Sequence, residues 1–337
     1  MKQSTSLRAF LGKRSTQWTG ILVVLIFAVT LPLYANIYVI GVAWNALFYM
    51  LLALGCNVIV GYAGLCDLGY SSKVAIGAYT TAILMKTFGW NFWATLPVSI
   101  LASAIIACLV GMPTLRLRGD YLAIVTLGFS EIIRLVARNL NVTGSASGIS
   151  GIKSPVIFGV KFSTPWMQYF IFLILVIIFI FVSLRLKRSR FGRALEYMRE
   201  DEDAARAMGV NVPRFKLLAF VIGSVMGGLA GSFYAVKMGS FSPSYVTFTE
   251  SAYILLIVVL GGMGKTPGML LGATLFIVLQ EIFRNVGNSR MLIFGILLVL
   301  IMIFRPQGIW PDKRPSFLPS RRERKQLSER TETHGTG

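Results

Sequence analysis

Two residue types that carry much of enzyme chemistry are scarce in this 337-residue sequence. It has one histidine, His334 in a polar tail, and three cysteines in or beside apolar runs. A histidine metal site or histidine acid–base catalysis is therefore not expected. Cys56, Cys66 and Cys108 lack ligand-like spacing, so we interpret them as small core residues rather than disulfide partners. No G-x-x-x-x-G-K-[ST] loop occurs, which excludes nucleotide binding by that device.

Charged residues are also few, at 14% of the chain against about a quarter in ordinary soluble domains. Apolar residues make up 55%, and the mean hydropathy is +0.69. Apolar runs near the length of a bilayer-spanning helix recur between residues 19 and 304. The alternating pattern of barrel strands is absent. We therefore predict an all-α, polytopic transmembrane protein.

The charge that is present is mostly positive, giving a net charge of +19 and a pI near 10.2. A nucleic-acid-binding surface is one interpretation of such a balance. However, most basic residues fall in four short segments, at 2–14, 116–118, 185–216 and 305–330. Cytoplasmic loops of membrane proteins concentrate Lys and Arg in this way. The distribution therefore indicates membrane topology, and no nucleic-acid partner is expected.

Placing the four basic segments in the cytoplasm orders the apolar runs into about ten spans with both termini cytoplasmic. The stretch 139–165 is then an external loop, and 185–216 is a cytoplasmic loop. The expected domains are an N-terminal segment (1–18), a membrane domain (19–311) and a disordered, charged tail (312–337). The crossings are expected at residues 19–40, 44–60, 65–88, 94–114, 121–139, 167–184, 217–236, 253–264, 269–286 and 291–304.

The first apolar run also has features of a cleavable signal peptide. A basic leader precedes it, and the tripeptide LYA at 33–35 fits a cleavage site. Pro32 and the continuation of the run to Ile40 favour a retained span. Cleavage would leave the new terminus outside, as a retained span does, so the rest of the topology is the same.

The long cytoplasmic loop contains the segment SRFGRALEYMREDEDAARAMGVNVP at 189–213. We expect one short helix over 190–208, ended by Gly209 in a left-handed cap and by Pro213 beyond it. Two charged pairs lie four residues apart on it: Glu202 with Arg206, and Arg199 with Asp203. A helix of this length is marginal alone in water and needs a partner surface, although a solvated surface helix also fits the pattern.

Within this segment Asp203, Ala204 and Ala205 precede Gly209 with the spacing D-A-A-x-x-x-G. The pattern resembles the coupling loop of ABC importer permeases, which usually has Glu in place of Asp203. Other segments resemble, in order and over about 45–311, the branched-chain amino acid permeases of LivM type. They are GYAGLCDLGY at 61–70, AIGAY at 75–79, RLRGDY at 116–121, AIVTLGFSEIIRL at 123–135, TG at 143–144, GISG at 148–151, GRAL at 192–195, KLLAF at 216–220, GGMG at 261–264 and RPQG at 305–308.

The resemblance implies a permease subunit in a bacterial inner membrane. It would pair with a second permease chain, identical or different, on two ATP-binding subunits, and an external binding protein would deliver the substrate. This chain would bind no cofactor, because ATP belongs to the partner subunits. Branched-chain or other apolar amino acids are the expected cargo, with urea, short amides or sugars as alternatives. The residues expected to dock on the ATPase are Arg193, Glu200, Asp203, Ala204, Ala205 and Gly209.

Polar residues inside the spans are candidates for the pathway, because charges there are expensive. Glycines interrupt the stretch 61–79, as in the broken helices that line transport pathways, although small residues also serve close helix packing. Asp67 and Lys73 could neutralise each other there or belong to a cytoplasmic gate. Lys73 and Lys265 depart from the family pattern. The expected pathway or gate residues are Asp67, Tyr70, Lys73 and Glu131.

Two acidic residues in the spans have an arginine three positions later, Glu131 before Arg134 and Glu281 before Arg284. Each pair can form within its helix, and a neutralised pair at the outer interface is an alternative to substrate contact. Electrostatic complementarity orients docking proteins. The expected landing surface for the binding protein includes Arg138, Thr143, Gly148, Arg284 and Arg290.

Two other functional classes fit less well. An ion-coupled secondary transporter would need an acidic relay deep in the spans and would leave the 189–213 segment unexplained. An intramembrane enzyme would need a nucleophile–base pair or a metal cluster. The sequence therefore favours a non-enzymatic transport subunit that depends on a separate ATPase.

Overall fold

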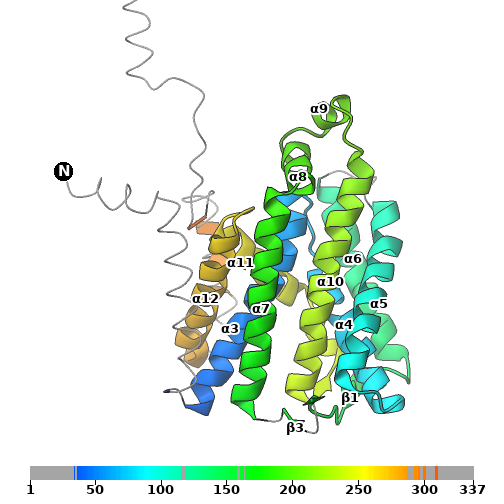
Figure 1. Ribbon diagram of the computed structural model, residues 1–337, viewed down its shortest axis with the longest axis vertical. Helices are drawn as coiled ribbons and strands as arrows, with labels where there is room; N and C mark the ends of the chain where they lie inside the picture. Colours follow the sequence, from blue (N-terminus) through cyan, green and yellow to red (C-terminus); the bar gives the residue numbers. More distant parts are fainter. Residues whose placement is uncertain are drawn as a thin grey trace, which may run out of the picture.

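The computed structural model describes residues 34, 36–114, 119–157, 160–162 and 164–286, and short pieces between 292 and 309. The N-terminal segment 1–18, residues 19–33 and 35 of the expected first span 19–40, most of the tenth span 291–304 and the tail 312–337 lie outside the described residues. The rest of the chain forms a bundle of helices that lie roughly side by side (Figure 1).

Eight helices of the described chain form the bundle. Four segments are long and apolar enough to cross a membrane, namely Ile37–Tyr62, Phe92–Pro113, Pro165–Arg188 and Val212–Met238. Two shorter apolar helices accompany them. The eight helices are α3 (Ile37–Cys56), α4 (Tyr70–Thr87), α5 (Phe92–Thr114), α6 (Asp120–Asn139), α7 (Pro165–Arg188), α10 (Val212–Met238), α11 (Phe248–Gly261) and α12 (Thr266–Ile282). The chain is thus a mostly helical, multi-span protein, as predicted.

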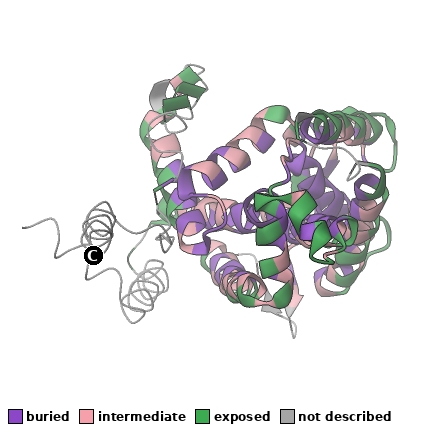
Figure 2. Cartoon of the chain, turned by 90° about the horizontal axis from the view of Figure 1, so that it is seen from above, coloured by how far each residue is buried: buried purple, intermediate pink, exposed green. Residues whose placement is uncertain are grey.

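Helix α10 lies inside the bundle against α4 and α5, where small residues permit close approach. A Cβ at Gly77 of α4 would overlap the carbonyl oxygen of Gly228, and one at Gly231 would overlap that of Val74. On the side of α5, the hydroxyls of Ser99 and Ser232 lie 2.7 Å apart. Viewed along the helices, the buried residues gather where helices meet and the exposed ones face outward (Figure 2). Close helix packing of this kind holds membrane bundles together.

The chain between α3 and α4 is not an α-helix. Helix α3 continues into a π-helical turn, η1 (Asn57–Tyr62), and residues 63–69 follow without helical structure. The expected crossing 65–88 is therefore helical only from Tyr70. The separation of the first two spans at 40–44 is also wrong, because α3 already begins at Ile37.

The predicted single helix over 190–208 is two helices, α8 (Arg190–Glu200) and α9 (Glu202–Ala207). Asp201 between them is extended, and its carboxylate accepts the backbone N–H groups of Asp203 and Ala204 at 2.9 and 3.0 Å. An aspartate that caps a new helix in this way ends the preceding one. The left-handed cap at Gly209 is confirmed, with φ +84°. Helices α7 and α10 extend into the expected loop 185–216, which leaves 189–211 between them.

Short elements lie at the end of the bundle opposite α8 and α9 (Figure 1). Strand β1 (Ile149–Ser150) pairs antiparallel with β4 (Ser240–Phe241), and β2 (Val156–Ile157) pairs with β3 (Val160–Lys161). Single turns complete this end: η2 (Ser145–Ser147), η3 (Pro243–Tyr245) and η4 (Phe283–Val286). The segment 139–165 lies at this end. We call the two ends the α8 end and the β1 end.

Candidate functional site

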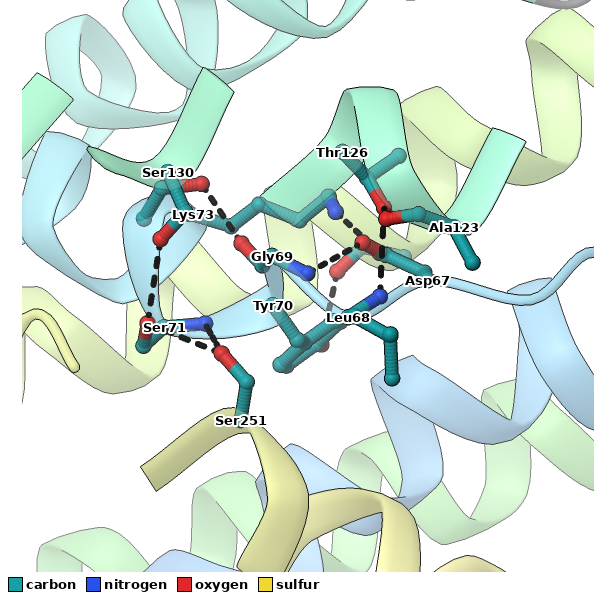
Figure 3. Close-up of polar contacts among 12 residues, drawn as sticks. Asp67, Leu68, Gly69, Tyr70, Ser71, Lys73, Ala123, Thr126, Ser130 and Ser251 are labelled. Atoms are coloured by element: carbon teal, nitrogen blue, oxygen red, sulfur yellow. Dashed lines mark hydrogen bonds and ion pairs between the residues drawn. The ribbon is translucent and has the colours of Figure 1, made fainter. Parts of the chain in front are cut away.

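A buried ion pair lies beside the break between α3 and α4 (Figure 3). The Lys73 ammonium meets the Asp67 carboxylate, and the two residues are only 5% and 1% exposed. Asp67 also accepts the backbone N–H of Gly69 at 3.1 Å, and the Lys73 nitrogen lies 4.3 Å from the centre of the Phe220 ring. The two residues are six apart, so the ion pair joins the non-helical segment to the first turn of α4.

The first turn of α4 and the first turn of α11 meet inside the bundle. The Ser71 backbone N–H donates to the Ser251 hydroxyl at 3.1 Å, and the Ser71 hydroxyl donates to the Thr247 carbonyl, also at 3.1 Å. Ser130 of α6 lies 3.3 Å from the same Ser71 hydroxyl (Figure 3). The N-termini of α4 and α11 therefore meet at one polar cluster, and transporters often place polar pathway groups at helix N-termini inside the membrane.

A small cavity adjoins the ion pair between α4, α5, α6 and α10. Its volume is about 10 Å³, which is room for about one water molecule. The hydroxyls of Ser103 and Ser224 line it, and each is buried without a hydrogen-bond partner. In its present form the site is therefore too small for an amino acid.

The other two predicted pathway residues lie on either side of this region. The buried Tyr70 hydroxyl donates to the Gly223 carbonyl at 2.8 Å, which ties α4 to α10. Glu131 lies near the middle of the 20-residue helix α6 and pairs with Arg134 through a bond of 2.9 Å from Nε. Their side chains are 47% and 28% exposed. The pair predicted from the spacing is present, and it lies on an open face of the bundle.

The residues predicted to dock on an ATPase lie at the α8 end, and most are exposed. Ala205 is the exception at 1% exposed, because it packs inward. Glu202 pairs with Arg206 at 2.8 Å, as the spacing predicts, and also with Lys216 of α10 at 2.9 Å. The exposed members of the predicted set are Arg193, Glu200, Asp203, Ala204 and Gly209.

The predicted landing surface lies at the β1 end. Arg138 is exposed, whereas the Thr143 hydroxyl is buried and bonds the carbonyls of Ala137 and Leu140 at 2.6 and 2.7 Å. A Cβ at Gly148 would overlap the Phe241 carbonyl oxygen, so this glycine serves the β1–β4 contact. Arg290 lies outside the described residues.

The second predicted pair is also present. Arg284 lies 3.4 Å from Glu281 and donates to the Tyr38 hydroxyl at 2.6 Å. Tyr38 in turn bonds Glu281, so this exposed cluster joins the start of α3 to the end of α12 at the β1 end.

Sequence reasoning missed three contacts at the α8 end. Arg199 Nη1 donates to the Gly61 carbonyl at 2.6 Å, whereas the spacing on a continuous helix predicts a pair with Asp203. Asn57 Oδ1 accepts the Gly264 N–H at 2.8 Å, and Lys187 donates to the Gly264 carbonyl at 2.7 Å. An asparagine inside an apolar run was a usable signal for the second contact. The other two join residues far apart in the sequence and leave no local pattern.

No three metal-ligating side chains gather anywhere in the part of the chain that the structure describes. The candidate functional features are therefore three: the non-helical segment 63–69 with the Asp67–Lys73 ion pair, which we call the polar break, the α8–α9 segment, and the charged face of α6.

Comparison with known proteins assigns the chain to a family. The family model for the branched-chain amino acid transport system permease component matches residues 38–304. The high-affinity branched-chain amino acid transport system permease proteins LivM of Salmonella typhimurium and Escherichia coli K12 are each 42% identical, over 92% of this chain and 78% of theirs. A probable LivM of Methanocaldococcus jannaschii is 28% identical over 80% of this chain and 92% of its own. No solved structure matches significantly. The chain therefore belongs to the family of branched-chain amino acid transport permease components.

Proposed function

We propose that this chain is the membrane-spanning subunit of an ATP-binding-cassette importer that moves branched-chain or other apolar amino acids inward. The observation that carries the proposal is the family match across 38–304, which includes the polar break, the α8–α9 segment and the face of α6. On this proposal the chain performs no catalysis of its own and binds no cofactor.

The proposed topology has ten spans, with both termini and the α8 end in the cytoplasm of a bacterial inner membrane. The nine basic residues between 185 and 216 support this orientation, because positive loops stay on the inner side. The β1 end would then face outward and receive a solute-binding protein, with Arg138 and Arg284 on the landing surface.

The α8–α9 segment is the proposed contact with the ATPase subunits. Its tip exposes Asp203, Ala204 and the 68%-exposed Met208 beside the capping Gly209. Small and apolar groups at this tip permit close contact with the ATPase surface, and the negative charge of Asp203 orients that contact. Movement of the ATPases would pull on this segment and alter the packing of the helices below it.

The open face of α6 is the proposed boundary of the pathway and of the contact with the second permease subunit. A half-exposed ion pair near mid-helix would be costly against lipid tails. The cost is smaller where Glu131 and Arg134 face a water-filled path between two permease chains. We therefore infer that this face looks toward the second permease chain.

Reconstitution of the complex tests the proposed function. The permease, its ATPase partners and its binding protein are placed in vesicles, and uptake of labelled leucine, isoleucine and valine is measured. Uptake should require ATP hydrolysis on the ATPase side and should stop with a non-hydrolysable ATP analogue. The purified chain alone should transport nothing under an ion gradient. Ion-driven uptake by the chain alone would refute the proposal. Uptake of urea or sugars instead of amino acids would refute the proposed substrate and leave the importer role standing.

A further inference from the structure

Arg199 joins the α8–α9 segment to the polar break. It lies in the last turn of α8, and its Nη1 donates to the carbonyl of Gly61 at 2.6 Å. The aliphatic part of the same side chain packs against Gly64. A Cβ added at Gly64 would lie only 2.8 Å from the Arg199 Cγ. Gly64 has φ +69°, a conformation that favours glycine. One side chain therefore contacts both ends of the bend that leads from α3 into the non-helical segment.

The Gly61 carbonyl is available because the helix ends in a π-helical turn. In a regular α-helix the N–H of Leu65 would donate to this oxygen. Here the Leu65 N–H donates to Ile59 at 3.0 Å, and the Ala63 N–H donates to Val58 at 3.3 Å. A cationic donor at the last carbonyls of a helix stabilises that end. Arg199 thus satisfies an oxygen that the widened turn leaves open.

The same turn is fixed on its other side. Asn57 Oδ1 accepts the Gly264 N–H between α11 and α12, and Lys187 at the end of α7 donates to the Gly264 carbonyl. A Cβ at Gly61 would overlap the Asn57 oxygen and lie 2.6 Å from the Gly264 nitrogen. The turn is therefore clamped between two connections of the bundle, and π-helical turns of this kind often mark functional sites.

From the turn, a short path leads to the buried ion pair. Residues 63–69 form no helix that could absorb a displacement, and they include Asp67, which pairs with Lys73 in the first turn of α4. We propose that Arg199 is a positioning residue that transmits movement of α8 to the polar break. When the partner ATPases move α8, Arg199 pulls the 61–64 bend and shifts the N-terminus of α4. This inference rests on the proposed function.

The test separates transport from ATP hydrolysis. Arg199→Met keeps the stem over Gly64 and removes the donor. In vesicles holding the full complex, we expect leucine moved per ATP hydrolysed to fall at least tenfold, with ATP hydrolysis within about twofold of the wild type. Arg199→Lys, which keeps a cationic donor, should recover part of that ratio. Arg214→Met is the matched control, because Arg214 is an exposed arginine in the first turn of α10, outside the α8–α9 segment, and its ratio should not change.

Several results would overturn the inference. They are an unchanged ratio in Arg199→Met, an equal fall in Arg214→Met, or a parallel loss of transport and hydrolysis in Arg199→Met, which would indicate a purely structural role. If Arg199→Met does not assemble, the Lys variant decides, because a wild-type ratio or a parallel loss there would also contradict it. Failure of the wild-type complex to move amino acids would instead refute the proposed function.

Discussion

The buried pair Asp67–Lys73 offers the sharpest test of the energetics. Lys73→Met removes the ammonium and leaves the Asp67 carboxylate, 1% exposed, with the Gly69 N–H as its described donor. Removing one partner of a buried ion pair costs about 3–5 kcal/mol. The contact between the ammonium and the Phe220 ring at 4.3 Å is also lost, at about 0.5–2 kcal/mol. The adjoining cavity, which has room for about one water, partly offsets these terms. We therefore expect a loss of about 3 kcal/mol.

The double variant Asp67→Asn with Lys73→Met removes both charges, and replacing a whole buried pair is often close to neutral. We expect it to recover about 2 kcal/mol of the loss. The measurement is the free energy of unfolding in mixed micelles, titrated with sodium dodecyl sulfate for the wild type and each variant. Lys86→Met is the control, because Lys86 is exposed in the last turn of the same helix. It should stay within about 0.5 kcal/mol of the wild type. A change below about 1 kcal/mol in Lys73→Met, or a double variant less stable than Lys73→Met, would refute the reasoning.

Two further predictions concern the α8–α9 segment and the contact between α4 and α10. Asp203→Arg reverses the charge at the exposed tip of α9, so it should abolish uptake while membrane insertion stays intact; normal uptake would remove Asp203 from the ATPase contact. Gly231→Ala places a Cβ on the Val74 carbonyl oxygen, and since backbone cannot yield cheaply, it should cost at least about 1–3 kcal/mol of unfolding free energy. Gly128→Ala on the open face of α6 meets nothing within 4 Å and should be neutral or slightly stabilising. Equal stability of these two variants would contradict the close α4–α10 contact.

Much of the candidate site follows from sequence because its signals are local. Glu131 with Arg134 and Glu202 with Arg206 pair at helical spacing, so a helix prediction already places their side chains together. Asp67 and Lys73 pair across only six residues. The left-handed conformation at Gly209 also depends on its neighbours in the chain alone.

The failures have physical causes as well. The sequence around 190–208 is strongly helical, but Asp201 can bond its own downstream N–H groups, and this local competitor divides the helix. Ala205 belongs to the family pattern, yet it faces inward, because the direction of α9 is set by the Glu202–Lys216 contact with α10.

The amino-acid sequence by itself determines that this is a helical membrane protein, since long apolar runs have no other stable state in lipid, and the basic segments predict its orientation. Tertiary structure alone decides how the polar break is held. The bonds of Arg199 to Gly61, of Asn57 to Gly264, and of Ser71 to Ser251 join positions separated by 138, 207 and 180 residues. Such contacts depend on the packing of whole helices, and no periodicity or spacing in the chain encodes them.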